Sequence, residues 1–429
     1  MSYKKAALIV LALGVITHTL WFGNPPSAVF DEVHFGKFVS AYFTHEYYFD
    51  IHPPLGKLII AGWGNIWGFN PGFSFANIGE AYPDKLYLAL RFLPSLAGAL
   101  LPLVVFGIAI ELGIGIYAAT LAGSLVAFDN ALLAQSRLIL LDPFLLLFGF
   151  GAVWCYLVWR KRRASYWLLI LSGALIGAAA SIKWTGITFF AIIGILEIIR
   201  LFYNRNNMSP RKIILSVTAL FILPIAVYAG SFAVHFSLLN KPGSGDAFMP
   251  VNFQSTSFVD KFTALNKEMY RSNQRLSATH PYSSQWYTWP FLVRPIFYWM
   301  QGDARIYLIG NPFIWWASTA AIITMLGIAL RERRMASSAL IIIIGAWLIN
   351  LLPFIGIGRV MFLYHYLPAL VWAIIGLAWL VDRFPNPRKM ALGFGAVALI
   401  VFVFFAPLSY GLPMSERATS LRIWMSSWR

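Results

Sequence analysis

The sequence predicts an all-α polytopic membrane protein with about eleven transmembrane helices and two large outer-face loops. Of its 429 residues, 59% are hydrophobic and only 12% are charged, with a mean hydropathy of +0.69. Soluble domains carry about 25% charged residues, and disordered chains combine low hydrophobicity with high net charge. The apolar runs are about 20 residues long, as bilayer-spanning helices require. A soluble enzyme and a disordered chain are both excluded.

We read eleven apolar spans, in order along the chain: 6–23, 86–110, 115–131, 138–159, 165–182, 185–203, 213–236, 306–330, 337–355, 360–381 and 390–410. The first run follows Lys4 and Lys5 and resembles a secretory signal in that respect. No small-residue cleavage site follows it, so we interpret it as an uncleaved first span.

The net charge of +16 is concentrated in short segments between spans, which argues against a nucleic-acid surface, where charge gathers on one folded patch. Basic short loops mark the cytoplasmic face. The fifteen residues concerned are Lys4, Lys5, Arg160, Lys161, Arg162, Arg163, Arg205, Arg211, Lys212, Arg331, Arg333, Arg334, Arg383, Arg388 and Lys389. They predict a cytoplasmic N-terminus, an outer C-terminus and residence in the plasma membrane.

Two outer segments, 24–85 and 237–305, are too long to be simple turns, and such connections are usually functional. Within the first, residues 33–43 have helical spacing with one apolar face suited to the membrane interface. A second amphipathic helix is expected from Leu55 to Trp67, after His52-Pro53-Pro54. The second segment is rich in aromatic residues, which either anchor it at the interface or stack on sugars.

Asp31 and Glu32 are adjacent acids just after the first span. They are either solvated residues at a helix N-terminus or a general base at a water-poor boundary, where burial raises a carboxyl pKa. Neighbouring residues on a helix point about 100° apart. We therefore expect the two acids to have different roles.

Several cations map to the outer ends of spans, where few are expected: Arg91, Arg137, Lys183, Arg359 and, beyond it, His365. Each could extend to the lipid headgroups. Together they favour a shared anionic ligand, and a lipid-linked phosphate fits because arginine and lysine bind its oxygens at membrane depth. Asp142 is expected to be a counter-ion for one of these cations.

Metal binding is possible but not favoured. His34, His52, Asp31 and Glu32 could meet in space, yet the chain has no HExxH or paired-histidine spacing. It also has no glycine-rich nucleotide loop, and the single cysteine, Cys155, forms no disulfide framework. We expect no required cofactor.

Motifs in both outer segments resemble the protein O-mannosyltransferases, which have the GT-C glycosyltransferase fold. The first loop carries residues 31–36 (DEVHFG) and 50–58 (DIHPPLGKL), and the second carries residues 280–290 (HPYSSQWYTWP). Shorter matches follow the family order at residues 136–142, 181–186, 310–312 and 362–368. The resemblance covers almost the whole chain, which we treat as one GT-C domain, 1–429.

This resemblance implies inverting transfer of mannose from a polyprenyl- or dolichyl-phosphate donor to Ser or Thr hydroxyls of proteins on the outer face. It implies Asp31 as the general base, with Glu32 helping to bind the acceptor or to position the site. Arg91 falls where the family has an important arginine. His52, within the second motif, joins Arg137, Lys183, Arg359 and His365 as a substrate-binding candidate.

One departure concerns the second outer loop, 237–305. It is too short for the β-rich MIR domain that eukaryotic members insert there, so the chain resembles a prokaryotic-type member. The alternative function is a GT-C transferase with another lipid-linked sugar, or with a glycolipid or cell-wall acceptor. The expected partners are the lipid-linked donor, the acceptor protein and the bilayer. The sequence does not predict an oligomeric state.

Overall fold

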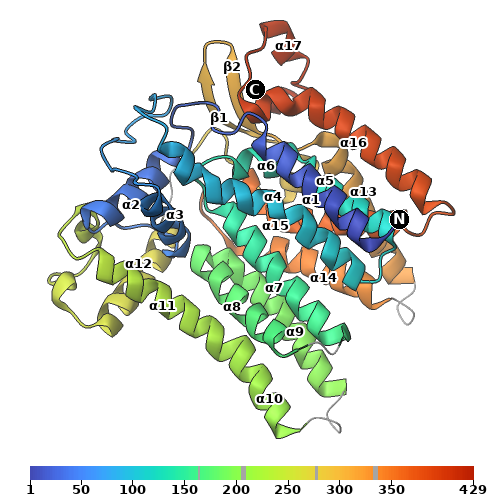
Figure 1. Cartoon of the computed structure of the whole chain (residues 1–429), viewed down its shortest axis with the longest axis horizontal. Helices are drawn as coiled ribbons and strands as arrows, with labels where there is room; N and C mark the ends of the chain where they lie inside the picture. Colours follow the sequence, from blue (N-terminus) through green and yellow to red (C-terminus); the bar gives the residue numbers. More distant parts are fainter. Residues whose placement is uncertain (163–164, 204–208, 276–278, 332–336) are drawn as a thin grey trace.

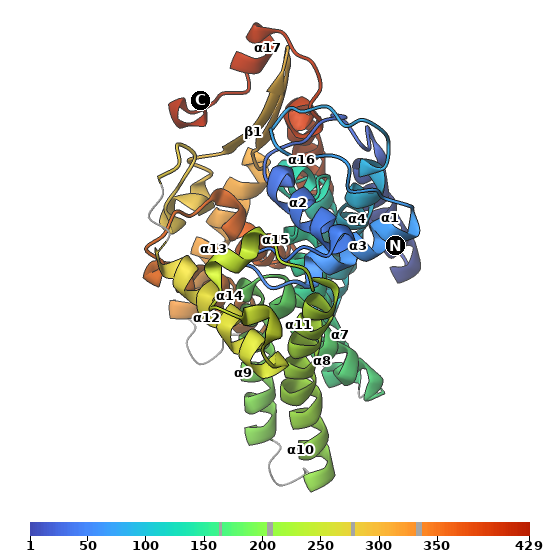
Figure 2. The same cartoon turned by 90° about the vertical axis from the view of Figure 1, so that its left-hand side faces the viewer.

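The structure, a computed structural model, describes residues 1–162, 165–203, 209–275, 279–331 and 337–429. Arg163, Arg205, Glu332, Arg333 and Arg334 therefore lie outside the described residues. Figure 1 shows a bundle of long helices with shorter elements gathered toward one end, including α2, α3, α12 and a β-hairpin. Figure 2 shows α10 projecting from the bundle at the end opposite the hairpin.

The expected spans correspond to helices. Their bounds are α1 Tyr3–Thr19, α4 Tyr87–Glu111, α5 Ile116–Ala127 with α6 Asn130–Ser136, α7 Asp142–Arg162, α8 Trp167–Ile182, α9 Ile187–Tyr203, α10 Pro210–Val217 with α11 Leu223–Leu238, α13 Pro312–Arg331, α14 Ser338–Leu351, α15 Leu367–Val381 and α16 Pro387–Tyr410. A π-helical turn, Thr218–Ile222, joins α10 to α11. Within the described chain, eight segments are long and apolar enough to cross a membrane, or nine with the bent pair α5–α6. Since α1 and α8 are shorter, the count of eleven stays a prediction.

The core of the bundle is α15, which packs against α5, α13 and α14. Nearly all of its residues are buried, as its uniformly apolar sequence requires. At the periphery, only 22% of the apolar 18-residue stretch of α10–α11, and the same share in α16, is buried inside the protein. These outer helices therefore present apolar side chains to the bilayer.

Two helices in the first outer segment confirm the expected ones: α2, Glu32–Thr44, and α3, Leu55–Ile66. The apolar face of α2 does not face the membrane interface, however. Its residues Phe35, Val39 and Tyr42 are buried within the protein, so this helix is fixed by packing rather than by lipid.

The second outer segment contains α12, Phe258–Arg275, and an antiparallel hairpin of β1, Ile296–Gln301, and β2, Ala304–Leu308. The span expected to begin at residue 306 is wrong at its start, because β2 occupies that stretch and α13 begins at Pro312. Three aromatic residues of this segment, Trp289, Tyr298 and Trp299, are buried packing residues. Neither interfacial anchoring nor sugar stacking describes these three.

The C-terminal segment lies on the same side of the bundle as the hairpin. It contains α17, Glu416–Ser420, whose Glu416 accepts a hydrogen bond from Arg305 of β2 at 2.6 Å. Trp428 Nε1 donates to the carbonyl of Leu292 at 2.7 Å. The chain therefore ends beside the second outer segment, as the topology predicts.

Candidate active site

Asp31 occupies the residue before the first turn of α2, and its backbone carbonyl accepts the helical hydrogen bonds from His34 and Phe35. Its side chain is half-buried and has no hydrogen-bond partner within the described part of the chain. Burial raises the pKa of Asp31 from 3.8 to about 7, Lys183 lowers it, and Asp142 and Asp50 raise it. A carboxylate with this pKa can accept a proton near neutral pH.

Glu32 points in a different direction and is completely buried, as the 100° step along the helix predicts. Its carboxylate accepts Arg91 Nε at 2.7 Å and Arg91 Nη2 at 2.6 Å. It also accepts the backbone N–H of Val29 and of Ile139, each at 2.9 Å, and the Tyr82 hydroxyl at 3.1 Å. The carboxylate thus ties together the first outer segment, α4 and the segment after α6.

Arg91 has no hydrogen-bond donor left for a substrate. Besides Glu32, its guanidinium donates to the backbone carbonyls of Gly23, Pro25 and Ser27 at 2.7–2.9 Å, and the side chain is fully buried. All five donors of an arginine are therefore used. Direct substrate contact by Arg91 or Glu32 stays a prediction, and this geometry speaks against it, because the pair instead fixes the loop that carries Asp31.

Arg137 is also occupied by the backbone. It donates to the carbonyls of His18 and Leu20, at 3.3 and 2.7 Å, and to that of Trp21. These carbonyls lie at the C-terminal end of α1, where a helix leaves acceptors unsatisfied. The guanidinium also stacks 4.5 Å from the centre of the Tyr410 ring in α16. This geometry favours a structural role in joining α1 to α16 over phosphate binding.

Lys183, at the end of α8, forms a buried ion pair with Asp142 at the start of α7. The Nζ–Oδ distances are 2.8 and 2.9 Å, so the expectation that Asp142 is a counter-ion is confirmed. Asp142 also accepts Gln135 Nε2 at 2.7 Å, and Gln135 in turn accepts the Tyr298 hydroxyl at 2.6 Å. This hydrogen-bonded chain holds Lys183 beside Asp31.

A cavity of about 230 Å³ brings together four of the predicted residues: His52, Lys183, Arg359 and His365. Arg359 follows the 3-10 turn Leu352–Gly356, is half-buried, and has no ion pair or hydrogen bond to any other described residue. Its guanidinium is therefore available to a ligand. The volume is slightly below that of typical small-molecule sites, which suits the polar head of a larger ligand.

The histidines of this cavity are held in place by neighbouring groups. Lys57 donates to the carboxylate of Asp50 and to the carbonyl of His52, at 2.9 Å in the second case, and so fixes the turn before α3. Burial, and then the charges of Lys183 and Lys57, lower the pKa of His52 well below 6.5. His52 is therefore neutral at physiological pH. His365 stacks on Trp289 with ring centres 5.8 Å apart.

Sequence reasoning missed the wall of the cavity that α12 supplies, formed by Tyr270, Asn273 and Gln274. Their spacing of i, i+3 and i+4 places them on one helical face. That periodicity could have revealed them, but we treated residues 237–305 as a loop. Trp184 and Thr185, directly after Lys183, also line the cavity.

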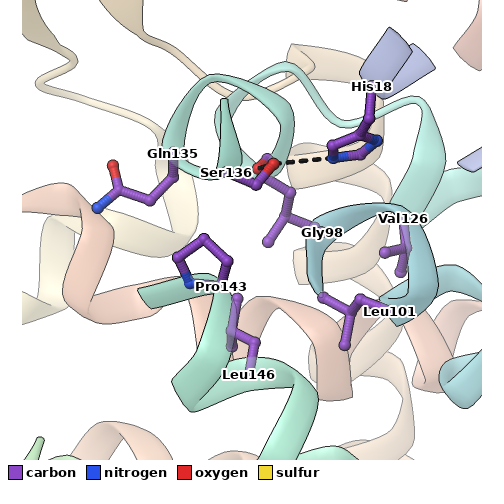
Figure 3. A pocket seen from close by; sticks show the side chains of 9 residues that line it. His18, Gly98, Leu101, Val126, Gln135, Ser136, Pro143 and Leu146 are labelled. Carbon is purple, nitrogen blue, oxygen red and sulfur yellow. Dashed lines mark hydrogen bonds between the residues drawn. The ribbon is translucent and has the colours of Figure 1, made fainter. Parts of the chain in front are cut away.

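A separate void of only about 10 Å³ lies between α1, α4, α6 and α7 (Figure 3). His18 Nε2 and Ser136 Oγ are 2.8 Å apart across it, and a Cβ on Gly98 would lie 2.4 Å from that of Ser136. Glycine is needed here for the close approach of α4 to α6. The void has room for one water at most, so we interpret it as a packing feature.

The described residues contain no group of three or more side chains suited to holding a metal ion. The acids and histidines considered from the sequence are dispersed: Glu32 pairs with Arg91, whereas His52 lines the cavity and His34 is exposed. Metal independence and the absence of a required cofactor stay predictions.

The structure resembles solved membrane glycosyltransferases. It superimposes on the Saccharomyces cerevisiae protein O-mannosyltransferase Pmt1–Pmt2 complex bound to the sugar donor, with a TM-score of 0.94 and 22% identity, over 100% of this chain and 93% of that one. ArnT from Cupriavidus metallidurans bound to undecaprenyl phosphate gives a TM-score of 0.56 at 14% identity, over 94% and 70% of the two chains. The fold is that of a GT-C membrane protein.

Two family models cover most of the sequence. Residues 6–240 match the dolichyl-phosphate-mannose-protein mannosyltransferase family, and residues 258–428 match the C-terminal four-transmembrane region of protein-O-mannosyltransferase. The chain belongs to the protein O-mannosyltransferase family.

Curated relatives match over part of their length. Protein O-mannosyltransferase 1 of Drosophila pseudoobscura pseudoobscura is 36% identical over 60% of this chain and 29% of the relative. Protein O-mannosyl-transferase 2 of Danio rerio is 30% identical over 66% and 40%, respectively. The chain thus spans less than half the length of these relatives.

Proposed function

We propose that this protein transfers mannose from a polyprenyl- or dolichyl-phosphate donor to Ser or Thr hydroxyls of proteins. The observation that carries the proposal is the half-buried Asp31, with a pKa of about 7, within electrostatic reach of Lys183, which lines a cationic cavity. Family membership supports the choice of sugar and acceptor. The description of the family that residues 6–240 match specifies dolichyl-phosphate-mannose and protein, and the solved yeast complex contains a sugar donor.

The proposed reaction has one displacement step. The oxygen of the acceptor hydroxyl attacks C1 of the mannose, and Asp31 takes the hydroxyl proton as the new C–O bond forms. The bond between C1 and the phosphate oxygen breaks on the opposite face, which inverts the anomeric configuration. The released lipid phosphate keeps the bonding electron pair and its negative charge.

Two cations support the leaving group. Arg359, whose guanidinium is free of ion pairs in the described chain, binds the phosphate oxygens, and Lys183 faces the same cavity. Charge-assisted hydrogen bonds of this kind stabilise a developing anion most effectively where water is excluded. The amides of Asn273 and Gln274 are the proposed partners for sugar hydroxyls. Because the site needs only positioning, proton removal and charge stabilisation, no redox cofactor is required.

We place the cavity on the outer face of the plasma membrane, with the N-terminus in the cytoplasm. The support is the concentration of basic residues in the short connections at the start of α1, α10 and α16. Basic connections remain in the cytoplasm during insertion. The variant Asp303→Cys in the hairpin turn, treated with a thiol reagent outside whole cells, would test this orientation. Absence of labelling at this position would contradict it.

The test of function is a transfer assay on the purified protein with polyprenyl-phosphate mannose and a Ser/Thr-rich peptide. Transfer of labelled mannose to the peptide through an alkali-labile bond supports the proposal, and Asp31→Asn must abolish this transfer. The matched control is Asp303→Asn, which changes an exposed aspartate in the hairpin turn. Donor binding without transfer to any peptide would instead favour the alternative, a GT-C transferase with another acceptor.

A further inference from the structure

A second large cavity, of about 650 Å³, lies at the basic end of the bundle between α1, α5 and α16. It is an open groove, and its volume falls within the range of small-molecule sites. The cavity lined by Lys183 and Arg359 contains no residue of these three helices. The groove therefore has no part in the proposed transfer reaction.

Beyond the end lined by Lys5 and Arg388, the lining of the groove is mostly apolar. The floor is α5, whose Thr120 and Ser124 hydroxyls donate to carbonyls of their own helix at 2.6 and 2.9 Å, so they present no free donor. The walls are Ile9 of α1 and Leu392 and Leu399 of α16, which are 38%, 63% and 42% exposed. Such a surface suits a hydrocarbon chain.

The length of the groove matches one leaflet of a bilayer. Its lining runs from Tyr117 to Phe128 on α5 and from Arg388 to Leu399 on α16. At 1.5 Å per residue, each stretch is about 16 Å long. The hydrocarbon core of a bilayer is about 30 Å thick, so one acyl chain lying in the groove would extend close to the midplane.

Positive charge stands at one end of the groove only. Lys5 and Arg388 both line the end that begins at Tyr117, and the Arg388 guanidinium lies 5.7 Å from the centre of the Tyr117 ring. One acid, Asp382, lies beside Gly115 at the start of α5. The two cations, with Lys4 and Lys389 next to them in sequence, outnumber it. A basic end joined to an apolar channel is complementary to a lipid with an anionic headgroup.

We propose that this groove binds one anionic phospholipid from the leaflet at the basic end of the bundle. The headgroup phosphate lies between Lys5 and Arg388, and an acyl chain follows α5 toward Phe128. The lipid fills the space between α1 and α16, which approach each other at the other end of the bundle through Arg137 and Tyr410. This binding is independent of the transfer reaction, so either proposal can fail without the other.

Native mass spectrometry of the delipidated full-length protein tests the proposal with two lipids of identical acyl chains, phosphatidylglycerol and phosphatidylcholine. We expect one phosphatidylglycerol to bind at least tenfold more tightly than phosphatidylcholine. Lys5→Gln combined with Arg388→Gln should remove that preference. The matched control is Arg211→Gln with Lys212→Gln, which removes the same charges from α10 and should leave the preference intact.

The apolar part of the site has its own pair of variants on α16. Gly395 lines the groove, and a Cβ there would sit 3.7 Å from Leu121, so Gly395→Phe fills the channel without changing charge. Gly393→Phe introduces the same side chain where nothing lies within 4 Å, outside the groove. We expect at least tenfold weaker phosphatidylglycerol binding in the first variant and wild-type binding in the second.

Three results would overturn the proposal. The first is equal affinity for the two lipids in the wild-type protein. The second is the same loss in the α10 control pair as in the groove pair. The third is a dimer in detergent that Gly395→Phe dissociates, which would assign the groove to a second copy of the chain.

Discussion

Two regions of this protein hold charged side chains around the loop that carries Asp31 and Glu32. They differ in whether the hydrogen-bond donors and acceptors of these side chains are all used. In the first, Glu32 and Arg91 satisfy each other and surrounding backbone groups completely. In the second, Asp31 and Arg359 have no hydrogen-bond partner in the described chain, and Arg359 lines a cavity. Buried charge alone therefore does not identify a binding residue. Unused hydrogen-bonding capacity facing a cavity is the more specific sign.

The largest expected effect is on the acid that the second region leaves unpaired. Asp31→Asn should lower the transfer rate by about 10²–10⁴-fold, because it removes general-base catalysis, while donor binding changes little. Its folded-state pKa is raised above 3.8, so the carboxyl destabilises the fold increasingly as pH rises from about 4 to 7. Asn removes that cost. At pH 8 the variant should unfold at an equal or higher temperature, and a lower unfolding temperature would contradict this.

Arg91→Gln should mainly reduce stability. Breaking a buried ion pair costs about 3–5 kcal/mol, here by removing the Arg91 hydrogen bonds to the Glu32 carboxylate and to three backbone carbonyls. We expect a clear fall in unfolding temperature and a low yield of folded protein. The donor KM of the fraction that stays folded should be unchanged. A raised KM at wild-type stability would return Arg91 to the substrate site.

Arg359→Gln should raise the donor KM by roughly tenfold, the effect of losing about 1.4 kcal/mol of charge-assisted hydrogen bonding. Its unfolding temperature should not change, since its guanidinium has no partner in the described chain. Arg137→Ala is the contrasting variant. It should destabilise the contact of α1 with α16 and leave the donor KM unchanged.

The pH dependence of transfer tests the electrostatics of Asp31. The reaction needs the unprotonated carboxylate, so kcat/KM should fall about tenfold per pH unit below pH 7 and level off above it. Lys183→Gln removes the cation that lowers this pKa and frees Asp142, whose charge raises it. The fall in kcat/KM on the acidic side should therefore begin at a higher pH in this variant. An unchanged pH profile would mean that a group other than Asp31 titrates.

The smallest expected effect is at the polar wall of the cavity. Asn273→Ala should raise the donor KM a few-fold, since one neutral hydrogen bond contributes about 0.5–1.5 kcal/mol. Asn252→Ala, in a turn of the same outer segment but not in the cavity lining, is the control. Equal effects of the two changes would remove α12 from the binding site.

Hydropathy predicted most of the fold because long apolar runs have few alternatives in a membrane. It did not predict the 54° bend between α5 and α6. That break depends on Asp129, which caps α6 and accepts Trp315 Nε1 at 2.8 Å, a partner distant in sequence. The β-hairpin was missed for a similar reason: β2 is apolar and runs directly toward α13, so composition does not separate them.

The candidate site was predicted unevenly. That Asp142 is a counter-ion for one of the outer-end cations was foreseen, but its partner, Lys183, was not, because Lys183 is distant from Asp142 in the sequence. The sequence could not distinguish Arg91 and Arg137 from Arg359, since all three are arginines at span ends. Only the three-dimensional arrangement shows that backbone carbonyls of residues 18–27 occupy the first two. Every residue carries a backbone carbonyl, so the pattern of side chains in a sequence does not predict which carbonyls accept these hydrogen bonds.

A comparison of Arg91→Gln with Arg359→Gln tests whether unused hydrogen-bonding capacity, rather than buried charge, identifies a substrate-binding arginine. Each change removes one guanidinium, fully buried in Arg91 and half-buried in Arg359, and for each we would measure the unfolding temperature and the donor KM. We expect that Arg91→Gln lowers the unfolding temperature without changing KM, and that Arg359→Gln raises KM without changing the unfolding temperature. The opposite assignment, or the same pair of changes in both variants, would contradict it.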